Sequence, residues 1–539
     1  MLWSTGAALG AFEAGRELDM SLAPVDLIII GAYAAGLIAL ATLISREKAG
    51  HKKDTSDYFL AGKSLPWWAI GASLIAANIS AEQIIGMAGS GYAVGLAIAS
   101  YEWMAALALL LVGKFFLPIF LKRGIYTMPQ FLEQRFGPSV KYVMSVFWIG
   151  LYTFVNLTTV LWLGATAISA MTGAPMVAGM VLLAMLAAAY SLYGGLKAVA
   201  MTDIIQVVLL IIGGFIITAI VLEKVGGGDV FAGYQRLAAD FPQKFDMVLS
   251  RDNPEYKNLP GLGVVIGGMW IMNLSYWGCN QYIIQRALGA KDLKEAQKGI
   301  LFAAFLKVLM PLIIVVPGIA AFALVPDLAK PDQAYPEMMK LVPQGLRGLI
   351  FAGLIAAIVS SLGSMMNSIS TIFTMDLYKP LAGRNTSERG LVGVGRITAF
   401  TAMIIALFAA RPFLAGADQV FQIIQEYTGF FTPGIVAIFA LGLFWARATE
   451  LGALAAVVGS FALSLAFKLW LPGMPFMDRV GVVFLLCIGL GVALSMIQKP
   501  AAEEKIVRLG DVSFKTGAGF NIGATIVTAA IIAIYAFYW

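Results

Sequence analysis

Apolar runs of about 20 or more residues recur along the whole chain, separated by short polar segments. A helix of that length crosses a hydrocarbon core roughly 30 Å thick, because each helical residue rises about 1.5 Å. The pattern predicts an all-α integral membrane protein with about fourteen transmembrane helices. The predicted spans lie near residues 24–45, 67–90, 97–121, 139–170, 174–194, 199–223, 260–285, 298–325, 346–378, 392–411, 417–446, 449–472, 478–497 and 518–538.

The second predicted span holds a cluster of polar residues in the stretch AANISAEQIIG, residues 76–86. Each polar member would be costly in hydrocarbon without a partner, and they are Asn78, Ser80, Glu82 and Gln83. Asn and Ser side chains compete for backbone hydrogen bonds and loosen a helix. Irregular backbone at membrane depth needs protein or a watery cavity around it, so a break at residues 76–80 implies a site. The alternative is a kink filled by hydrogen bonds between helices.

A second irregular span is GGMWIMNLSYWGCNQY, residues 267–282, where Asn273 and Ser275 stand beside Tyr276 and Trp277 between glycines. Its Asn-Leu-Ser echoes the Asn-Ile-Ser at residues 78–80. Interrupted helices at corresponding positions of two halves mark a midplane site in transporters. Five spans from 67 to 223 and five from 260 to 446 would form such halves. An odd number of spans per half predicts an inverted repeat.

A polar stripe runs along the stretch AAIVSSLGSMMNSIST, residues 356–371. Its members recur at three- and four-residue spacing on one helix face, and they are Ser360, Ser361, Ser364, Asn367, Ser368 and Thr371. Helix packing through small residues is one explanation. If the broken second span lies alongside, the hydroxyls of Ser360 and Ser361 and the freed carbonyls would form an oxygen cage that suits Na⁺.

Three charged residues within the spans are candidates for function. Glu102, in IASYEWM, sits early in the third span and needs a partner or a ligand there. Asp203 lies near a predicted cytoplasmic helix start, where the helix dipole alone would favour a carboxylate. Lys307 stands about eight residues inside its span, from which a lysine can snorkel to the interface.

Composition supports the membrane assignment and excludes several classes of protein. Of the 539 residues 60% are hydrophobic and 13% charged, and the mean hydropathy is +0.83. The two cysteines, Cys279 and Cys487, both lie in predicted spans and offer no disulfide framework. His51 is the single histidine, which argues against a histidine metal centre or a Ser-His-Asp hydrolase.

Basic residues predict the orientation of the chain. Clusters of Lys and Arg at residues 46–63, 122–141, 286–298, 379–389 and 499–515 fall on one side when fourteen spans are counted. That side is therefore predicted to be cytoplasmic, with both termini outside. The loop at 224–259 is also basic, but longer translocated loops follow the rule loosely. The net charge of +6 is then a topology signal and gives no reason to expect nucleic acid. Charges within the first twenty residues argue against a cleaved signal peptide.

Five segments, in matching order and spacing, carry a resemblance: DYFLAGKSLPWWAIGASLIAANISAEQ, YGGLKAVAMTDIIQ, YWGCNQYIIQR, AAIVSSLGSMMNS and FQIIQEYTGFFTPG. Over nearly its whole length the chain resembles the sodium/solute symporter family, in particular its sodium/galactose and sodium/glucose type. The resemblance implies a leucine-transporter-type 5+5 inverted-repeat core with one helix before it and three after. The implied units are an N-terminal segment with the first helix (1–66), a first repeat (67–223), an extracellular loop (224–259), a second repeat (260–446) and three C-terminal helices (447–539).

The resemblance also implies residue roles. The Na⁺ ligands would be the backbone carbonyls of Ala76, Ile79 and Ala357 and the hydroxyls of Ser360 and Ser361, with Asp203 on the ion's exit route. The sugar contacts would be Asn78, Gln83, Glu102, Asn273, Lys307 and Gln425. Tyr276 would stack on the sugar as the inner gate, backed by Asn78 or Trp277, while Met87 and Tyr152 would help to close the outside. Two departures are Ala105, where the galactose symporters have a sugar-contacting serine, and a shorter outer loop at 326–345.

These residue types suit a hexose, whose hydroxyls both donate and accept and so match carboxamides and a carboxylate. An aromatic ring suits the C–H face of the sugar. The sequence therefore predicts a secondary active transporter in the bacterial inner membrane that couples Na⁺ entry to uptake of galactose or glucose. Na⁺ would be the co-transported ion, without an organic cofactor. The lipid bilayer would be a further partner, and a homodimer is left open.

Other functions remain open from the sequence. A symporter of an anionic sugar, inositol or proline belongs to the same class, and Lys307 leaves an anionic solute open. A membrane-embedded enzyme would need a nucleophile with its base or a metal cluster. A channel would need a selectivity filter, and a solute-sensing receptor would need a cytoplasmic signalling domain.

The predicted topology can be tested by cysteine labelling in intact cells. We expect Lys52→Cys to resist a membrane-impermeant thiol reagent until the membrane is permeabilised, because residue 52 lies in a predicted cytoplasmic loop. Lys257→Cys, in the predicted external loop, is the control and should react at once. Labelling of Lys52→Cys from outside would contradict the orientation.

Overall fold

The computed structural model describes residues 22–45, 63–125, 127–193, 196–382 and 387–539. Over these residues the chain forms helices, joined by loops that contain one isolated bridge between Leu65 and Ala290. The predicted all-α architecture is thereby confirmed.

The helices of the first half are α2 (Pro24–Ser45), α4 (Trp67–Asn78), α5 (Ala88–Ala93), α6 (Ser100–Leu111), α7 (Leu117–Lys122), α8 (Met128–Arg135), α9 (Pro138–Gly150), α10 (Thr158–Thr172), α11 (Met176–Tyr193), α12 (Leu196–Gly226) and α13 (Val230–Asp240). Those of the second half are α14 (Gly261–Ile266), α15 (Gly268–Leu274), α16 (Gln281–Leu288), α17 (Leu293–Leu324), α18 (Ala334–Met339), α19 (Leu346–Thr371), α20 (Lys379–Ala382), α21 (Glu388–Leu414), α22 (Val420–Thr428), α23 (Thr432–Phe444), α24 (Glu450–Trp470), α25 (Phe476–Met496) and α26 (Ala518–Phe537). Wider π-helical turns interrupt them at η2 (Glu82–Met87), η4 (Val112–Phe116), η5 (Leu151–Leu157), η8 (Ser275–Cys279) and η10 (Ile372–Tyr378).

Each of the fourteen predicted spans corresponds to a helix, a run of helices or a bent pair. Among the described residues nine helices are long and apolar enough to cross a membrane, and three bent pairs raise the number to twelve. The two remaining predicted spans, near 24–45 and 174–194, correspond to α2 and α11, whose described apolar parts are shorter.

Three spans are broken within the described parts of the chain. The second span bends by 60° between α4 and the helix that begins at Glu82, and the seventh bends by 79° at Gly267. Both interruptions were predicted from the polar clusters. A third bend, of 45°, separates α22 from α23. It was not predicted, although Gly429 and Pro433 stand at the break and are the residues that end helices.

The helices pack closely where glycines face a neighbouring backbone. α17 lies against α4 and α5. A Cβ atom at Gly71 on α4 would lie 2.7 Å from the carbonyl oxygen of Gly299 on α17, and one at Gly318 on α17 would lie 2.2 Å from that of Ala88 on α5. These approaches hold both halves of the broken second span against one long helix.

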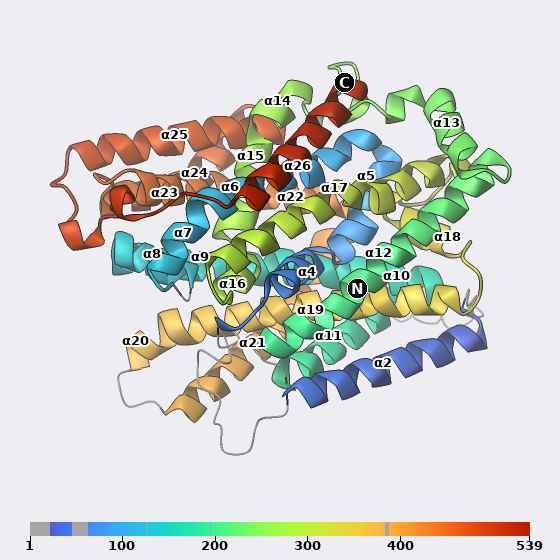
Figure 1. The fold of residues 1–539 in the computed structure, drawn as a ribbon, viewed down its shortest axis with the longest axis horizontal. Helices are drawn as coiled ribbons and strands as arrows, with labels where there is room; N and C mark the ends of the chain where they lie inside the picture. Colours follow the sequence, from blue (N-terminus) through green and yellow to red (C-terminus); the bar gives the residue numbers. More distant parts are fainter. Residues whose placement is uncertain (1–21, 46–62, 126, 194–195, 383–386) are drawn as a thin grey trace, which may run out of the picture.

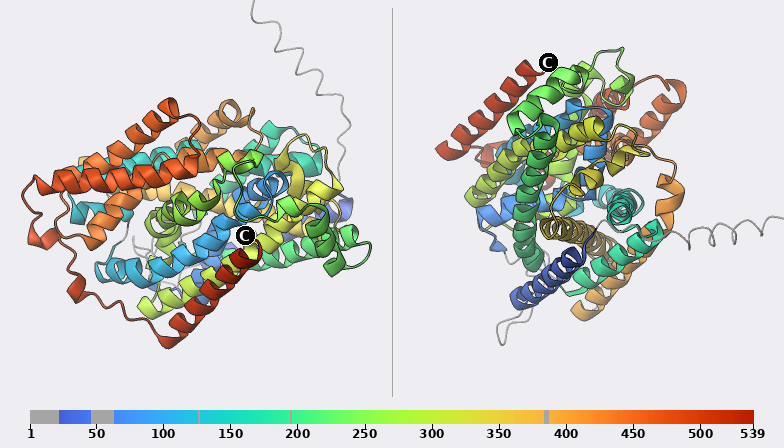
Figure 2. Two further views of the ribbon diagram at one scale, coloured as in Figure 1. Left: turned by 90° about the horizontal axis from the view of Figure 1, so that it is seen from above. Right: turned by 90° about the vertical axis from the view of Figure 1, so that its right-hand side faces the viewer.

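Peripheral helices cover the packed core. α2 lies along α19 and α12, whereas α24 and α25 form the opposite edge in Figure 1. α26 crosses α6 and α17. The right-hand view of Figure 2 shows α2 and α26 on opposite sides of the molecule.

Two buried charges cap helix ends. Asp26 accepts hydrogen bonds from the backbone amides of Gly345 (2.6 Å) and Gly348 (2.9 Å), which anchors α2 to the start of α19. Arg135 donates to four backbone carbonyls at and beyond the end of α23, those of Gly442, Trp445, Ala446 and Ala448. Each charge meets the helix end whose dipole attracts it.

Candidate functional site

The break in the second span frees backbone groups in the middle of the bundle. α4 ends at Asn78, and Ile79 has an extended conformation (φ −71°, ψ 93°) that no helix continues. The Ser80 hydroxyl accepts a hydrogen bond from the amide of Glu82 at 3.2 Å, as a side-chain cap does for a new helix. The last turn of α4 therefore presents carbonyl groups without helical partners to its surroundings.

α19 packs against α4 and presents hydroxyl groups. The Ser360 hydroxyl donates to Asp203 Oδ1 at 2.6 Å, which leaves its lone pairs free to face another group. Ser361 is fully buried, and its hydroxyl has no hydrogen-bond partner among the described residues. Ala357 lies one turn earlier on the same face of the helix. An unpaired buried hydroxyl is costly, so Ser361 is a candidate to contact a ligand.

Asp203 connects four helices. It accepts hydrogen bonds from Ser73 on α4 (2.8 Å) and Ser360 on α19, and it forms an ion pair with Arg286 on α16 (3.6 Å). Arg286 in turn donates to the hydroxyls of Ser73 (2.8 Å) and Ser364 (3.0 Å). Asp203 lies two turns inside α12, so the helix dipole does not explain it. From the sequence, Arg286 counted only as a loop charge, although it is the last residue of the quoted segment YWGCNQYIIQR.

One cavity brings the predicted sugar-binding residues together. It encloses about 680 Å³ of atom-free space, part of it open to solvent. All seven predicted sugar-contacting residues line it: Asn78, Gln83, Glu102, Asn273, Tyr276, Lys307 and Gln425. Met87, Trp277 and Ala105 line it as well. The residues come from five spans and meet only in the folded chain.

A buried ion pair lies at the centre of this cavity. Lys307 Nζ is 2.5 Å from Glu102 Oε2 and also donates to the side-chain oxygen of Asn78. The ammonium lies 5.0 Å from the centre of the Trp277 ring. Lys307 is fully buried, so the interpretation that it snorkels to the interface is wrong. Its charge is compensated inside the bundle.

Tyr276 lines the cavity, and two further tyrosines pack behind it to form one wall. The Tyr276 hydroxyl accepts from Asn78 Nδ2 (3.2 Å) and from the Tyr282 hydroxyl (2.9 Å). Tyr152 donates to Asn280 Oδ1 at 2.7 Å, and its ring packs edge-on against Tyr282. Tyr152 thus joins the tyrosine wall. Its role with Met87 in closing the outside stays a prediction.

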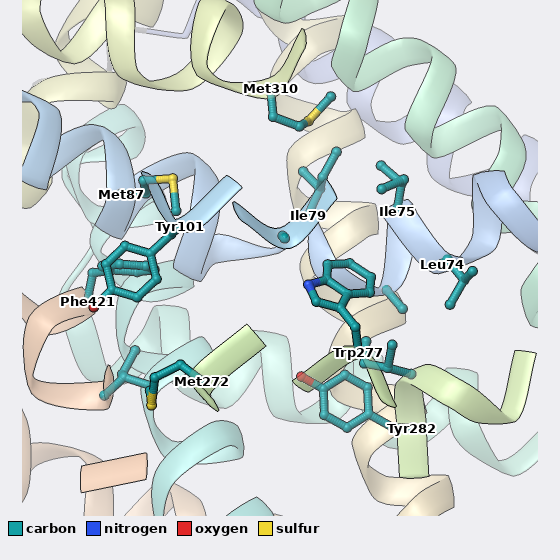
Figure 3. Packing of buried hydrophobic residues seen from close by; sticks show 14 of the residues in the cluster. Leu74, Ile75, Ile79, Met87, Tyr101, Met272, Trp277, Tyr282, Met310 and Phe421 are labelled. Carbon is teal, nitrogen blue, oxygen red and sulfur yellow. The ribbon is translucent and has the colours of Figure 1, made fainter. Parts of the chain in front are cut away.

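The opposite wall contains residues that sequence reasoning missed. The rings of Tyr101 and Phe421 pack edge-on at 5.1 Å, and Figure 3 shows Met87 next to them. In the same view Trp277 and Tyr282 lie on the other side, near Ile79. Tyr101 directly precedes Glu102, and Phe421 precedes Gln425 by one helical turn. That spacing is the only signal that could have identified them.

The loop between α17 and α19 packs over α5 and α22. Asp332 Oδ2 accepts from the backbone amide of Val420 at 3.2 Å, and a Cβ atom at Gly89 would clash with Asp332. Burial raises the pKa of the Asp332 carboxyl to about 7, against the smaller opposing effects of the Val420 amide and Lys330. This short loop therefore contacts the helices that carry Met87 and Phe421.

Comparisons with known proteins agree on a family. The family model described as "Sodium:solute symporter family" matches residues 58–459. The chain is 48% identical over 543 residues to a sodium/glucose cotransporter of Vibrio parahaemolyticus, which covers 97% of this chain and 100% of that protein. It is 35% identical over 475 residues to a sodium/myo-inositol cotransporter 2 of Mus musculus, covering 83% and 70%.

Solved structures show the same fold. A substrate-bound, outward-open Na⁺-coupled sialic acid symporter matches with a TM-score of 0.77 at 23% identity, covering 89% of this chain and 99% of that one. Mhp1, a nucleobase-cation-symport-1 family transporter in a closed conformation, matches with a TM-score of 0.56 at 15% identity, covering 84% and 98%. The predicted leucine-transporter-type fold is confirmed, and the alternative of a membrane-embedded enzyme is wrong, because relatives and fold are those of transporters.

The central ion pair can be tested through stability. We expect Glu102→Ala to lower the free energy of unfolding by about 3–5 kcal/mol, because it leaves the Lys307 ammonium buried without a counter-charge. Thermal unfolding in detergent without Na⁺ or sugar measures the loss. Adding Lys307→Met should restore most of it, since both buried charges are then gone. An unchanged midpoint in Glu102→Ala alone would contradict the assigned role.

Proposed function

Because the chain belongs to the sodium:solute symporter family, we propose that it couples Na⁺ entry to the uptake of a hexose, galactose or glucose, by alternating access in a bacterial inner membrane. The observation that carries the proposal is the shared cavity of the seven predicted contact residues. Their carboxamides, carboxylate and ammonium offer both donors and acceptors at buried positions. That mixture suits a rigid molecule covered with hydroxyls.

The ion site in this proposal lies where the break of α4 meets α19. The carbonyls of Ala76 and Ile79 would come from the end of α4. Ala357, Ser360 and Ser361 would contribute one carbonyl and two hydroxyls from α19. The buried Ser361 hydroxyl supports this set, because it has no described partner. Asp203 accepts a hydrogen bond from Ser360, which leaves the lone pairs of the hydroxyl oxygen free for the ion, and it would lie on the route by which the ion leaves.

The two aromatic walls suit alternating access. Tyr276, held by Asn78 and Tyr282, would form the inner gate, with Trp277 behind it and Tyr152 as a further support. Met87, Tyr101 and Phe421 would close the other side. The broken helices α4–η2 and α15–η8 carry residues of both walls. A shift of these helices would therefore open one wall as it closes the other.

Na⁺ supplies enough free energy for concentrative uptake. One ion crossing about 100 mV yields roughly 2.3 kcal/mol, and a tenfold Na⁺ gradient adds roughly 1.4 kcal/mol. Together they allow sugar accumulation of several hundredfold at one ion per sugar.

A cyclitol is the second candidate substrate. A relative described as a sodium/myo-inositol cotransporter is 35% identical to the chain, and Ala105 removes a hydroxyl from the cavity wall relative to the predicted galactose pattern. Inositol and hexose present similar rings of hydroxyls, so the same polar residues could bind either. Counterflow of both solutes decides between them.

The ion site is tested by Ser361→Ala. We expect it to raise the Na⁺ concentration for half-maximal uptake by about tenfold or more, because the hydroxyl is one of few ion ligands. Uptake into proteoliposomes over a Na⁺ series measures the change. The matched control is Ser464→Ala on α24, which removes another buried hydroxyl without a described partner. Wild-type Na⁺ dependence in Ser361→Ala would remove this residue from the site.

The substrate is tested by counterflow of labelled galactose, glucose, myo-inositol and proline in Na⁺-loaded proteoliposomes. We expect galactose or glucose to exchange, and Gln83→Ala to weaken sugar binding by roughly 1–3 kcal/mol, or about 5- to 150-fold. Calorimetry in Na⁺ and in choline gives the affinities. The control is Ile84→Val, a buried neighbour outside the cavity lining. Exchange of proline alone, or an unchanged sugar affinity in Gln83→Ala, would contradict the proposal.

A further inference from the structure

Glu82 is the charged residue of the polar cluster at residues 76–86. The predicted ion and sugar contacts give it no role. It begins η2, directly after the break in the second span, and its side chain is buried. It lines the same cavity as Gln83, Glu102 and Lys307. A buried carboxylate at membrane depth is costly, so its retention calls for a function.

The hydrogen bonds to Glu82 are weak. Oε1 is 3.3 Å from the Thr159 hydroxyl, but that hydroxyl lies closer to two backbone carbonyls, of Val155 (2.7 Å) and Asn156 (3.1 Å). Because a hydroxyl has a single proton to donate, the bond to Glu82 competes with two shorter ones. The Asn156 side chain is its other partner. Both partners are neutral.

No cation compensates Glu82 in the part of the chain that the structure describes. Three charged residues line the cavity: Glu82, Glu102 and Lys307. Lys307 is held by Glu102 at 2.5 Å and by Asn78. Two further buried charges, Asp203 and Arg286, form an ion pair with each other. When Glu82 is ionised, the cavity therefore holds two carboxylates against one ammonium, an excess of one negative charge at Glu82.

Such a charge acts on any solute in the cavity. Water and ions screen it little, because the cavity walls are protein of low dielectric constant. We propose that Glu82 is a charge filter that admits uncharged sugars, favours solutes bearing an ammonium group and rejects sugar acids. This inference rests on the proposed sugar transport and deepens it. It favours neutral over anionic substrates. Lys307 left that choice open in the sequence, but its charge is paired with Glu102 in the structure.

The test uses two galactose analogues that differ only in charge at one carbon. They are 6-amino-6-deoxygalactose, a cation at pH 7, and galacturonate, an anion. Each competes with labelled galactose in Na⁺-driven counterflow by the full chain in proteoliposomes. The measured quantity is the ratio of the two inhibitory concentrations, anion over cation. We expect a ratio of at least about ten in the wild type.

Glu82→Gln preserves shape and removes the charge, so we expect it to lower this ratio by about 10- to 100-fold. Glu82→Asp keeps the charge and should keep the ratio above one. The matched control is Glu504→Gln, which neutralises an exposed carboxylate far from the cavity and should leave the ratio unchanged.

The outcomes distinguish a failure of the charge filter from a failure of the proposed substrate. Absence of galactose counterflow in the wild type would refute the proposed substrate and not the filter, and the ratio is then measured around the neutral solute that does exchange. Working transport with an unchanged ratio in Glu82→Gln would overturn the filter. If Glu82→Gln fails to fold, the wild-type ratio still decides, because equal inhibition by cation and anion would show that no net negative charge faces the solute.

Discussion

Every backbone amide and carbonyl in the hydrocarbon layer must find a partner within the protein, and this constraint governs the structure. Most of the chain meets it with uninterrupted helices. Where α4 stops at Asn78, the freed groups are tolerated only because α17, α12 and α19 surround them. The glycines Gly71 and Gly299 let α17 approach closely enough to cover the break. The proposed site thus lies where a helix is interrupted and neighbouring helices surround its unpaired backbone groups.

Charge compensation is the second constraint, and it follows from the same low dielectric environment. Asp26 and Arg135 meet helix ends, Glu102 meets Lys307, and Asp203 meets Arg286. In each case a partner from a distant segment offsets the cost of burying the charge. Against this pattern Glu82 stands apart, because only neutral groups face it among the described residues. The departure from a rule that the rest of the bundle obeys is what points to function.

The break also places two proposed sites on one segment. Residues 76–83 contribute to the proposed ion site through Ala76 and Ile79, and to the sugar cavity through Asn78 and Gln83. A ligand at either site would fix the same few backbone angles. Because such coupling is reciprocal, Na⁺ and sugar would each favour the binding of the other. The network of Asp203, Ser73 and Arg286 extends this coupling to α12, α16 and α19.

Much of this architecture is local and could be predicted from the sequence. The length of the hydrophobic runs predicted the fourteen spans. The polar clusters at residues 76–83 and 267–282 predicted two of the three spans that are broken among the described residues. They could do so because the continuity of a helix depends on neighbouring residues. The bend between α22 and α23 was missed, since its Gly and Pro signals lie in an otherwise apolar run. Family resemblance supplied the seven predicted sugar contacts, and the fold brings all of them to one cavity.

Only the tertiary structure decided which charges are paired. Lys307 is compensated by a carboxylate 205 residues away in the chain, and Tyr152 packs edge-on against Tyr282 from a distant segment. Sequence spacing carries no information about such contacts, because they depend on how long helices cross. The sequence by itself determined that polar groups sit at membrane depth. The packing determined that Glu102 and Lys307 are paired inside the cavity, whereas Glu82 has only neutral partners among the described residues.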